Sequence, residues 1–193
     1  MKVLTILGSP RVDGNSTKLA KVFNETATDF GAEVSSVTLN KLSFRGCQAC
    51  DACKTVSDRC VVKDDLLPVL ESVERADILV LATPVYFSDI SAQMKGFVDR
   101  CYSFLAPYET VPEKSRLPEG KQMIFIVTQN WPDENVFNDV FPRYDMMFNA
   151  IGFHGNRCIR GCSLGKKDAI AKNNRNDLIN LAKTTAQEIF AQR

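Results

Sequence analysis

Short runs of mostly apolar residues alternate along this chain with longer segments in which apolar positions recur every three or four residues. The runs at 2–7, 78–82 and 122–128 are apolar over most of their length, which is typical of strands buried on both faces of a parallel sheet. Two more polar runs, at 33–39 and 153–161, suit strands at a sheet edge. The pattern therefore predicts five strands.

The segments with helical periodicity lie between and after these runs. They predict helices over residues 16–30, 64–76, 91–105, 135–151 and 176–191, the fourth bent or split at Pro142. Strands that alternate with helices in this way predict an α/β fold with a doubly wound parallel sheet and right-handed crossovers. A chain of 193 residues has the length of one ordinary domain. In such sheets a ligand binds at the carboxyl ends of the strands, where the strand order reverses.

Composition and charge narrow the function. Lys and Arg number 24 and Asp and Glu 23, so the net charge of +1 gives no electrostatic reason to expect nucleic acid or an anionic membrane as a partner. No apolar run is long enough to span a membrane, and the first strand begins at residue 2, so we expect no signal peptide. Seven cysteines without secretory features predict a reducing compartment, the cytoplasm.

The turn after the first strand, residues 8–17, has the sequence Gly-Ser-Pro-Arg-Val-Asp-Gly-Asn-Ser-Thr. It joins a buried strand to a helix N-terminus, whose free N–H groups and positive dipole attract an anion. It lacks the Gly-Lys-Ser/Thr end of a Walker loop and the Gly-x-Gly-x-x-Gly pattern, which favours a phosphomonoester as the ligand. The side chains expected to bind it are Ser9, Arg11, Asn15, Ser16 and Thr17. The alternative is an ordinary turn with Asn15 or Ser16 as a helix N-cap.

Two further strand ends carry ligand chemistry. The first, 83–88, reads Thr-Pro-Val-Tyr-Phe-Ser and offers backbone donors and two aromatic rings, although core packing is the alternative for the rings. The second, 128–131, reads Thr-Gln-Asn-Trp, of which the tryptophan would equally suit a subunit contact. A flat, partly polar ring fits between them while its phosphate lies on the first turn. Flavin mononucleotide (FMN) has this shape.

The motifs at 8–17 and at 83–95, where Thr-Pro-Val-Tyr-Phe-x-x-x-Ser-Ala-x-x-Lys stands, resemble those of the NAD(P)H-dependent FMN reductases of the flavodoxin superfamily. The resemblance covers nearly the whole chain. It implies a flavodoxin-like three-layer α/β/α fold over residues 1–193, a five-stranded parallel sheet of order 2-1-3-4-5, bound FMN, NAD(P)H as cosubstrate, and a homodimer or homotetramer. Residue by residue, it assigns the phosphate to the turn residues given above and the ring to Pro84, Val85, Tyr86, Phe87 and Ser88, with Thr128 and Gln129 on its other border. Ser91 and Lys95 also match, and their alternative roles are to start and to solubilise a helix.

A loop at about 43–63 is expected to interrupt this fold. It carries Cys47, Cys50, Cys53 and Cys60, which are separated by two, two and six residues. Three thiolates at steps of three suit one face of a 4Fe–4S cluster, and the fourth can complete it, although valine follows Cys60 where ferredoxins have proline. Zinc would call for cysteine pairs that lie further apart, and the reducing compartment disfavours a disulfide. Bare or redox-active thiols stay open. The arrangement resembles the iron-sulfur flavoproteins, relatives of the same reductases.

Two functions follow from these motifs. One is an FMN-dependent oxidoreductase that takes electrons from NAD(P)H and passes them to a small acceptor such as a quinone or a flavin. The other is an electron carrier that exchanges single electrons with a ferredoxin-like protein through the cluster. In both the flavin performs the chemistry, so no catalytic side chain is predicted. A single histidine, His154, argues against a hydrolase built on His. Asp64 and Asp65 most simply cap the helix that follows them.

Overall fold

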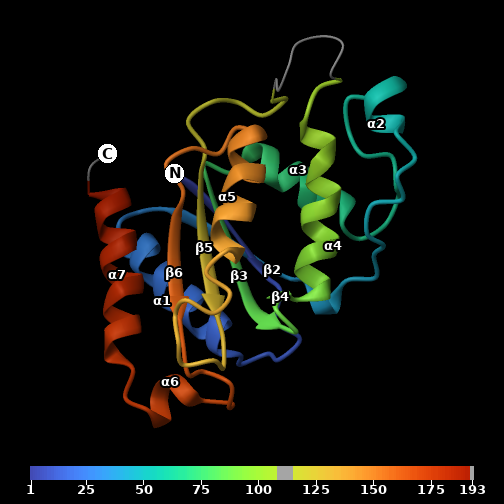
Figure 1. Cartoon of the computed structure of the whole chain (residues 1–193). Coiled ribbons are helices and arrows are strands. Elements are labelled where there is room, and N and C mark those ends of the chain that lie inside the picture. Colours follow the sequence, from blue (N-terminus) through green and yellow to red (C-terminus); the bar gives the residue numbers. More distant parts are fainter. Residues whose placement is uncertain (108–114, 192–193) are drawn as a thin grey trace.

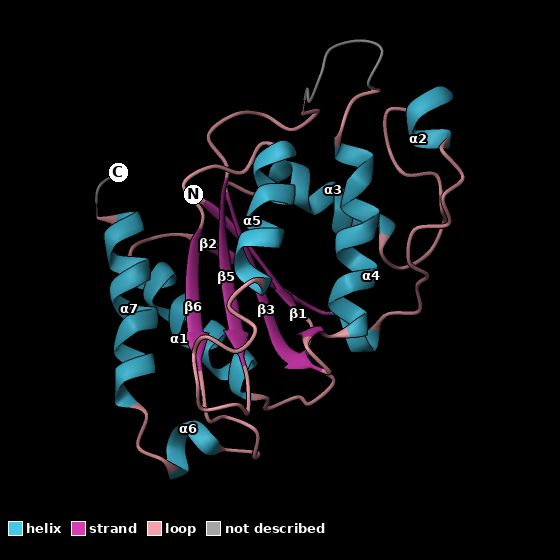
Figure 2. Ribbon diagram, viewed as in Figure 1, coloured by secondary structure: helices cyan, strands magenta, loops and turns pink. Residues whose placement is uncertain are grey.

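A twisted parallel sheet forms the middle layer of the computed structural model, which describes residues 1–107 and 115–191 (Figures 1 and 2). Its long strands are β1 (Lys2–Leu7), β2 (Glu33–Thr38), β3 (Ile78–Tyr86), β5 (Gln122–Thr128) and β6 (Arg157–Gly161). They lie in the order β2-β1-β3-β5-β6 and pair in parallel. Counted along the chain without the short β4, this is the order 2-1-3-4-5, and the flavodoxin-like fold is confirmed.

Helices cover both faces of the sheet (Figure 2). One face carries α1 (Asn15–Asp29) and α7 (Asn176–Phe190), and the other carries α3 (Leu67–Arg75), α4 (Ala92–Arg100) and α5 (Val140–Ala150). Alternate residues of β3 enter two separate cores: Ile78 and Val80 pack on the first face, Leu79 and Leu81 on the second. Because both faces are buried, the apolar run at 78–82 has no polar alternation.

Several predicted boundaries were wrong, for local reasons. Pro142 lies in the first turn of α5, where its missing N–H is harmless, so the helix begins at Val140 instead of bending there. The helix predicted over 64–76 begins at Leu67, and the one predicted over 91–105 ends as a 3-10 helix, η2 (Cys101–Phe104). The edge strand predicted over 153–161 begins at Arg157.

Short elements had no signal in the hydrophobic pattern. They are η1 (Leu39–Lys41), α2 (Ala52–Thr55), β4 (Asp89–Ile90) and α6 (Ala169–Lys172). β4 pairs antiparallel with the end of β3 and forms a hairpin at the carboxyl edge of the sheet. The predicted surface loop 106–120 lies partly outside the described residues.

The stretch between η1 and α3 carries Cys47, Cys50, Cys53 and Cys60 and is called the cysteine segment below. It lies on the outer side of α4, away from α1 and α7 (Figure 1). It leaves the sheet after η1, turns through α2 and returns to α3. The carboxyl ends of β1, β3 and β5 lie at the opposite end of α4 from α2 (Figures 1 and 2). Across residues 1–107 and 115–191, no helix has the length and apolar character of a membrane span.

Candidate functional site

The turn after β1 is shaped by two glycines that allow close approach. The Gly8 N–H donates to the Ala82 carbonyl at 2.8 Å, and the Ser91 hydroxyl donates to the Gly8 carbonyl at 2.7 Å. A Cβ on Gly8 would lie 2.9 Å from the Cβ of Met94, and one on Gly14 would lie 2.5 Å from the Ser9 hydroxyl. Both distances are too short for real side chains, so these positions require glycine.

The N-terminus of α1 offers donors for an anion. The Lys18 N–H donates to the Gly14 carbonyl at 3.0 Å, and the three N–H groups before it begin the helix without an intrahelical acceptor. Within the described part of the chain, the Ser16 hydroxyl is the one buried side-chain polar atom that has no hydrogen-bond partner. A buried polar group without a partner costs about 1–3 kcal/mol. A phosphate oxygen at this helix end would satisfy it, so these residues fit the phosphate of FMN.

A hollow of about 180 Å³ joins this turn to the other two strand ends. The residues predicted from sequence that line it are Ser9, Arg11, Asn15, Ser16, Pro84, Val85, Tyr86, Thr128 and Gln129. Thr17, Phe87 and Ser88 do not line it. Asn130, from the predicted strand end 128–131, does line it, and so do Leu164 and Gly165, which the sequence did not indicate. Sites for whole cofactors measure roughly 300–1,000 Å³. The hollow therefore suits a phosphate and its chain, with a ring at its open edge.

Two of the predicted amides are bound to the protein itself. The Asn15 amide donates to the carbonyls of Leu164 at 2.8 Å and Lys166 at 3.0 Å. The Gln129 amide donates to three carbonyls of its own loop, and its oxygen accepts from Arg160 at 2.8 Å. Since the amide donors of both side chains already bind carbonyls of the protein, these side chains hold the loops around the hollow in place.

The β3–β4 hairpin places aromatic rings beside the hollow. Phe87 and Ser88 form its turn with φ values of 45° and 79°, a left-handed conformation that is rare for residues other than glycine. The Phe87 ring is fully exposed and Tyr86 is 40% exposed. The hairpin is thus poised at the surface, where its rings can cover a flat ligand.

Helix α5 holds this hairpin through a contact that the sequence did not reveal. The Tyr144 hydroxyl donates to one carboxylate oxygen of Asp89 at 3.0 Å, and Arg143 donates to the other at 3.2 Å. Burial, followed by the hydrogen bond to Asp89, raises the pKa of Tyr144 far above its usual range. Tyr144 therefore stays protonated and keeps donating.

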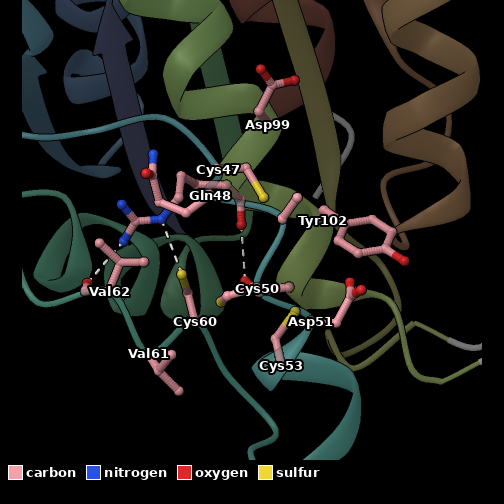
Figure 3. A pocket seen from close by; sticks show the side chains of 13 residues that line it. Cys47, Gln48, Cys50, Asp51, Cys53, Cys60, Val61, Val62, Asp99 and Tyr102 are labelled. Carbon is pink, nitrogen blue, oxygen red and sulfur yellow. Dashed lines mark hydrogen bonds between the residues drawn. The ribbon is translucent and has the colours of Figure 1, made fainter.

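The four predicted cysteine ligands surround a second cavity, of about 250 Å³ (Figure 3). Cys47 and Cys50 are exposed, Cys53 and Cys60 are half-buried, and all four are free thiols. In Figure 3 Cys60 lies to one side of Cys47, Cys50 and Cys53, and Tyr102 lies to the other. Asp99 also lines the cavity. Among the described residues, no three His, Cys, Asp or Glu side chains are grouped closely enough to hold a metal ion as they stand. The thiols line a cavity without converging on one point.

Arg100 is buried at the edge of this cavity, and the sequence did not indicate it. Its Nε donates to the Cys60 sulfur at 3.0 Å, and its Nη1 donates to Asp64 at 2.9 Å. The predicted helix cap is also present, since Asp64 accepts from the Leu66 N–H at 3.1 Å. Burial opposes ionisation of Asp64, but hydrogen bonds from Arg100 and from the Arg45 N–H outweigh it and lower the pKa of the carboxyl.

Two further cations fasten the cysteine segment. The Lys54 ammonium donates to the carbonyls of Tyr102 at 2.8 Å and Leu105 at 2.5 Å. The Arg116 guanidinium donates to the carbonyls of Cys53 at 2.8 Å and Ser103 at 2.9 Å. Burial raises the pKa of Cys53, and Lys54 opposes that rise. A cavity lined by four thiols and Arg100, with the charges of Lys54 and Arg116 acting on Cys53, has the chemistry of a site for a negatively charged thiolate-bound group.

The model of the NADPH-dependent FMN reductase family matches residues 1–133. The chain belongs to this family. It is 37% identical over 100 residues to an iron-sulfur flavoprotein of Archaeoglobus fulgidus, over 52% of this chain and 45% of that protein. An iron-sulfur flavoprotein of Methanocaldococcus jannaschii is 36% identical over 100 residues, which cover 52% of this chain and 51% of its relative. The matches thus span about half the length of these relatives.

Solved structures confirm the fold of this family member. The NAD(P)H:quinone oxidoreductase from Methanothermobacter marburgensis superposes with a TM-score of 0.75 at 17% identity, over 98% of this chain and 96% of that one. The FMN-dependent NADH-azoreductase from Bacillus anthracis, solved in complex with FMN, gives 0.69 at 16% identity, over 96% and 100%.

Proposed function

We propose that this protein binds FMN at the carboxyl ends of β1, β3 and β5 and acts as an oxidoreductase. In this proposal it takes electrons from NAD(P)H and passes them to a small acceptor such as a quinone or a flavin. The observation that carries the proposal is the unpartnered Ser16 hydroxyl, which lines the hollow at the N-terminus of α1. Bound FMN would supply the hydride-accepting centre.

The protein's own part is binding and electrostatics. The N–H groups of α1, the Ser16 hydroxyl and the Arg11 guanidinium hold the phosphate dianion, since helix N-termini and guanidinium groups favour phosphate. Backbone N–H groups of 85–88, at the edge of the hollow, would stabilise the negative charge that reduction adds to a ring bound there. Tyr86 lines the hollow and would cover the border of that ring.

The test is turnover without a protein partner. The chain, loaded with FMN, is mixed with NADH or NADPH and a quinone, and oxidation of the nicotinamide is followed by its absorbance. Oxidation that depends on both FMN and the quinone supports the proposal. A loaded protein that accepts no hydride from either nucleotide contradicts it.

A second function rests on the cysteine cavity: an iron-sulfur flavoprotein that holds a 4Fe–4S cluster and exchanges single electrons with a ferredoxin-like protein. Four thiols around one cavity, with Arg100, Lys54 and Arg116 beside them, support this candidate. In it Cys47, Cys50, Cys53 and Cys60 hold the cluster. Bound, such a cluster would supply one-electron transfer.

Chemical analysis tests this candidate directly. Iron, sulfide, zinc and flavin are measured on protein purified without oxygen and again after anaerobic reconstitution with iron and sulfide. Close to four irons and four sulfides per chain support it. Protein that stays free of iron after reconstitution contradicts it and leaves the cysteines as thiols. The homodimer or homotetramer and the cytoplasmic location stay predictions.

A further inference from the structure

The two ends of the cysteine segment are held together by one buried side chain. Arg100 ends α4, and its side chain has no exposed surface. Its Nη1 donates to the Arg45 carbonyl at 2.9 Å, before the first cysteine, and its Nη2 donates to the Val62 carbonyl at 3.0 Å, after the last. Both Nη atoms also reach the Asp64 carboxylate, at 2.9 and 3.4 Å. The guanidinium thus joins the two ends of the cysteine segment.

The remaining donor of the same group points to a cysteine. Nε lies 3.0 Å from the Cys60 sulfur, so each of the three guanidinium nitrogens has a partner. A hydrogen bond has a direction, and this one fixes where the Cys60 sulfur lies. Cys47 and Cys50, by contrast, are exposed.

A buried ion pair is an expensive way to join two ends of a loop. Well-packed apolar residues of the same volume often stabilise a protein as much or more. What the guanidinium adds is geometry, because its planar fork binds in fixed directions. It also adds a positive charge beside a sulfur that lines the cavity.

We propose that Arg100 is the positioning residue of this site: it holds residues 45–64 as a closed loop and donates a hydrogen bond to the Cys60 sulfur, which raises the reduction potential of a cluster bound there. The effect on the potential rests on the 4Fe–4S candidate described above. One-electron reduction adds a negative charge next to Cys60, and a cationic N–H donor stabilises that charge. The closed loop itself does not depend on the cluster.

The decisive comparison is between Arg100→Lys and Arg116→Lys. Lysine keeps the charge but has no planar fork and cannot reproduce the Nε contact. Arg116 also binds the loop, through the carbonyls of Cys53 and Asp58, and within the described residues it donates no hydrogen bond to a sulfur. It is therefore the matched control for a general loss of loop anchoring.

The full chain and both variants are reconstituted with iron and sulfide and titrated by a dye-coupled redox titration. Arg100→Lys is expected to shift the ratio of reduced to oxidised cluster about tenfold toward the oxidised form, about 59 mV for one electron. Arg116→Lys is expected to keep the wild-type potential. An Arg100→Lys protein with the wild-type potential overturns the proposed effect, and so does an equal shift in both variants.

A second measurement uses the protein without a cluster. In protein with ¹⁵N-labelled arginine, the Nε–H of Arg100 is expected to exchange with water at least about tenfold more slowly than in Cys60→Ala, since a hydrogen bond must break before exchange. Hydrogen exchange of residues 45–64 should also speed up in Arg100→Lys and not in Arg116→Lys. Fast exchange of the Nε–H in the wild type overturns the hydrogen bond to Cys60, and equal exchange of residues 45–64 in the wild type and Arg100→Lys overturns the closed loop.

The two proposals fail in different ways. If the wild type takes up no iron and sulfide, the proposed cluster is contradicted, and so is the proposed effect of Arg100 on its potential. The hydrogen-exchange data then test the remaining part of the proposal, the closed loop. Iron uptake together with fast Nε–H exchange supports the cluster but contradicts the proposed role of Arg100 in positioning Cys60. Should Arg100→Lys fail to fold, the wild type and Cys60→Ala still give the exchange result.

Discussion

The phosphate turn at 8–17 and the cysteine loop at 45–64 are both irregular segments with ligand chemistry, but they are held in different ways. The turn is fixed by close neighbours: the Gly8 N–H donates to the Ala82 carbonyl of β3, and a Cβ on Gly8 would collide with Met94 of α4. The cysteine loop is fixed by side chains from other elements, Arg100 above all, that reach its carbonyls. One site is therefore built from backbone and short side chains, the other from long cations.

This difference decides how each site responds to change. At Gly8 and Gly14 the turn leaves no room for a Cβ, which would lie 2.9 and 2.5 Å from neighbouring atoms. The loop tolerates small changes along its length but not the loss of a cation that binds several points at once. The predictions below separate these two behaviours.

The largest effect is expected at Arg100. Arg100→Met removes the cationic partner of the largely buried Asp64 carboxylate and leaves the carbonyls of Arg45 and Val62 without their donor. The free energy of unfolding should therefore fall by about 3–5 kcal/mol. Urea unfolding measures it. Lys95→Met, which breaks the exposed pair with Asp99, should cost less than about 1 kcal/mol. Equal losses of unfolding free energy in the two variants would show that Arg100 contributes no more to stability than an exposed ion pair does.

A smaller effect is expected where the turn is tight. In Gly14→Ala the new Cβ would meet the Ser9 hydroxyl at 2.5 Å, and such overpacking costs about 1–3 kcal/mol. Gly46→Ala in the cysteine loop is the control, since its Cβ would come no nearer than 3.7 Å to a neighbouring atom. Thermal unfolding of both compares them, and a Gly46→Ala loss as large as that of Gly14→Ala would refute the contrast between the sites.

Ser16→Ala tests the hydroxyl without a partner. Without ligand the variant should be as stable as the wild type or more so, because a buried unsatisfied group is removed. FMN affinity should fall by about tenfold, equivalent to about 1.4 kcal/mol. Fluorescence titration and urea unfolding give the two numbers. Thr28→Ala, which alters an exposed hydroxyl bonded within α1, should leave FMN affinity unchanged; a loss of stability in Ser16→Ala without ligand would contradict the prediction.

The smallest effect is a dependence on pH at Asp64. Its pKa is lower in the folded protein than in the unfolded chain, where it is about 3.9. A depressed pKa contributes stability that is complete above the unfolded value and is lost as the pH falls through the folded one. Stability measured from pH 6 down to about pH 3 should therefore fall less steeply in Asp64→Asn than in the wild type. Parallel curves would contradict this.

The same contrast explains what the sequence revealed. Strand order and the phosphate turn depend on residues that are close along the chain or repeat with a period, such as the apolar run at 78–82 and the glycines at 8 and 14. The cysteine spacing was equally visible. Arg100 was not, because its partners lie 36 to 55 positions away and nothing local distinguishes it from a surface arginine.

Other unpredicted features share this cause. Asn15 and Gln129 line the hollow, but the Asn15 amide donates to a carbonyl of the distant Leu164 and the Gln129 oxygen accepts from the distant Arg160. The hairpin β4 required Phe87 and Ser88 to adopt left-handed backbone, which their side chains disfavour. Local propensity points away from such a turn, and its pairing with β3 and the contacts of Asp89 with Tyr144 and Arg143 stabilise it.

The central claim is that the N-terminus of α1 binds the phosphate of FMN. Titration of the protein with FMN and, in parallel, with riboflavin tests it most directly, because riboflavin has the same ring without the phosphate. The phosphate's charge-assisted hydrogen bonds are worth about 1.5–3 kcal/mol each, so FMN should bind at least about a hundredfold more tightly. Equal affinity for the two flavins would contradict the claim.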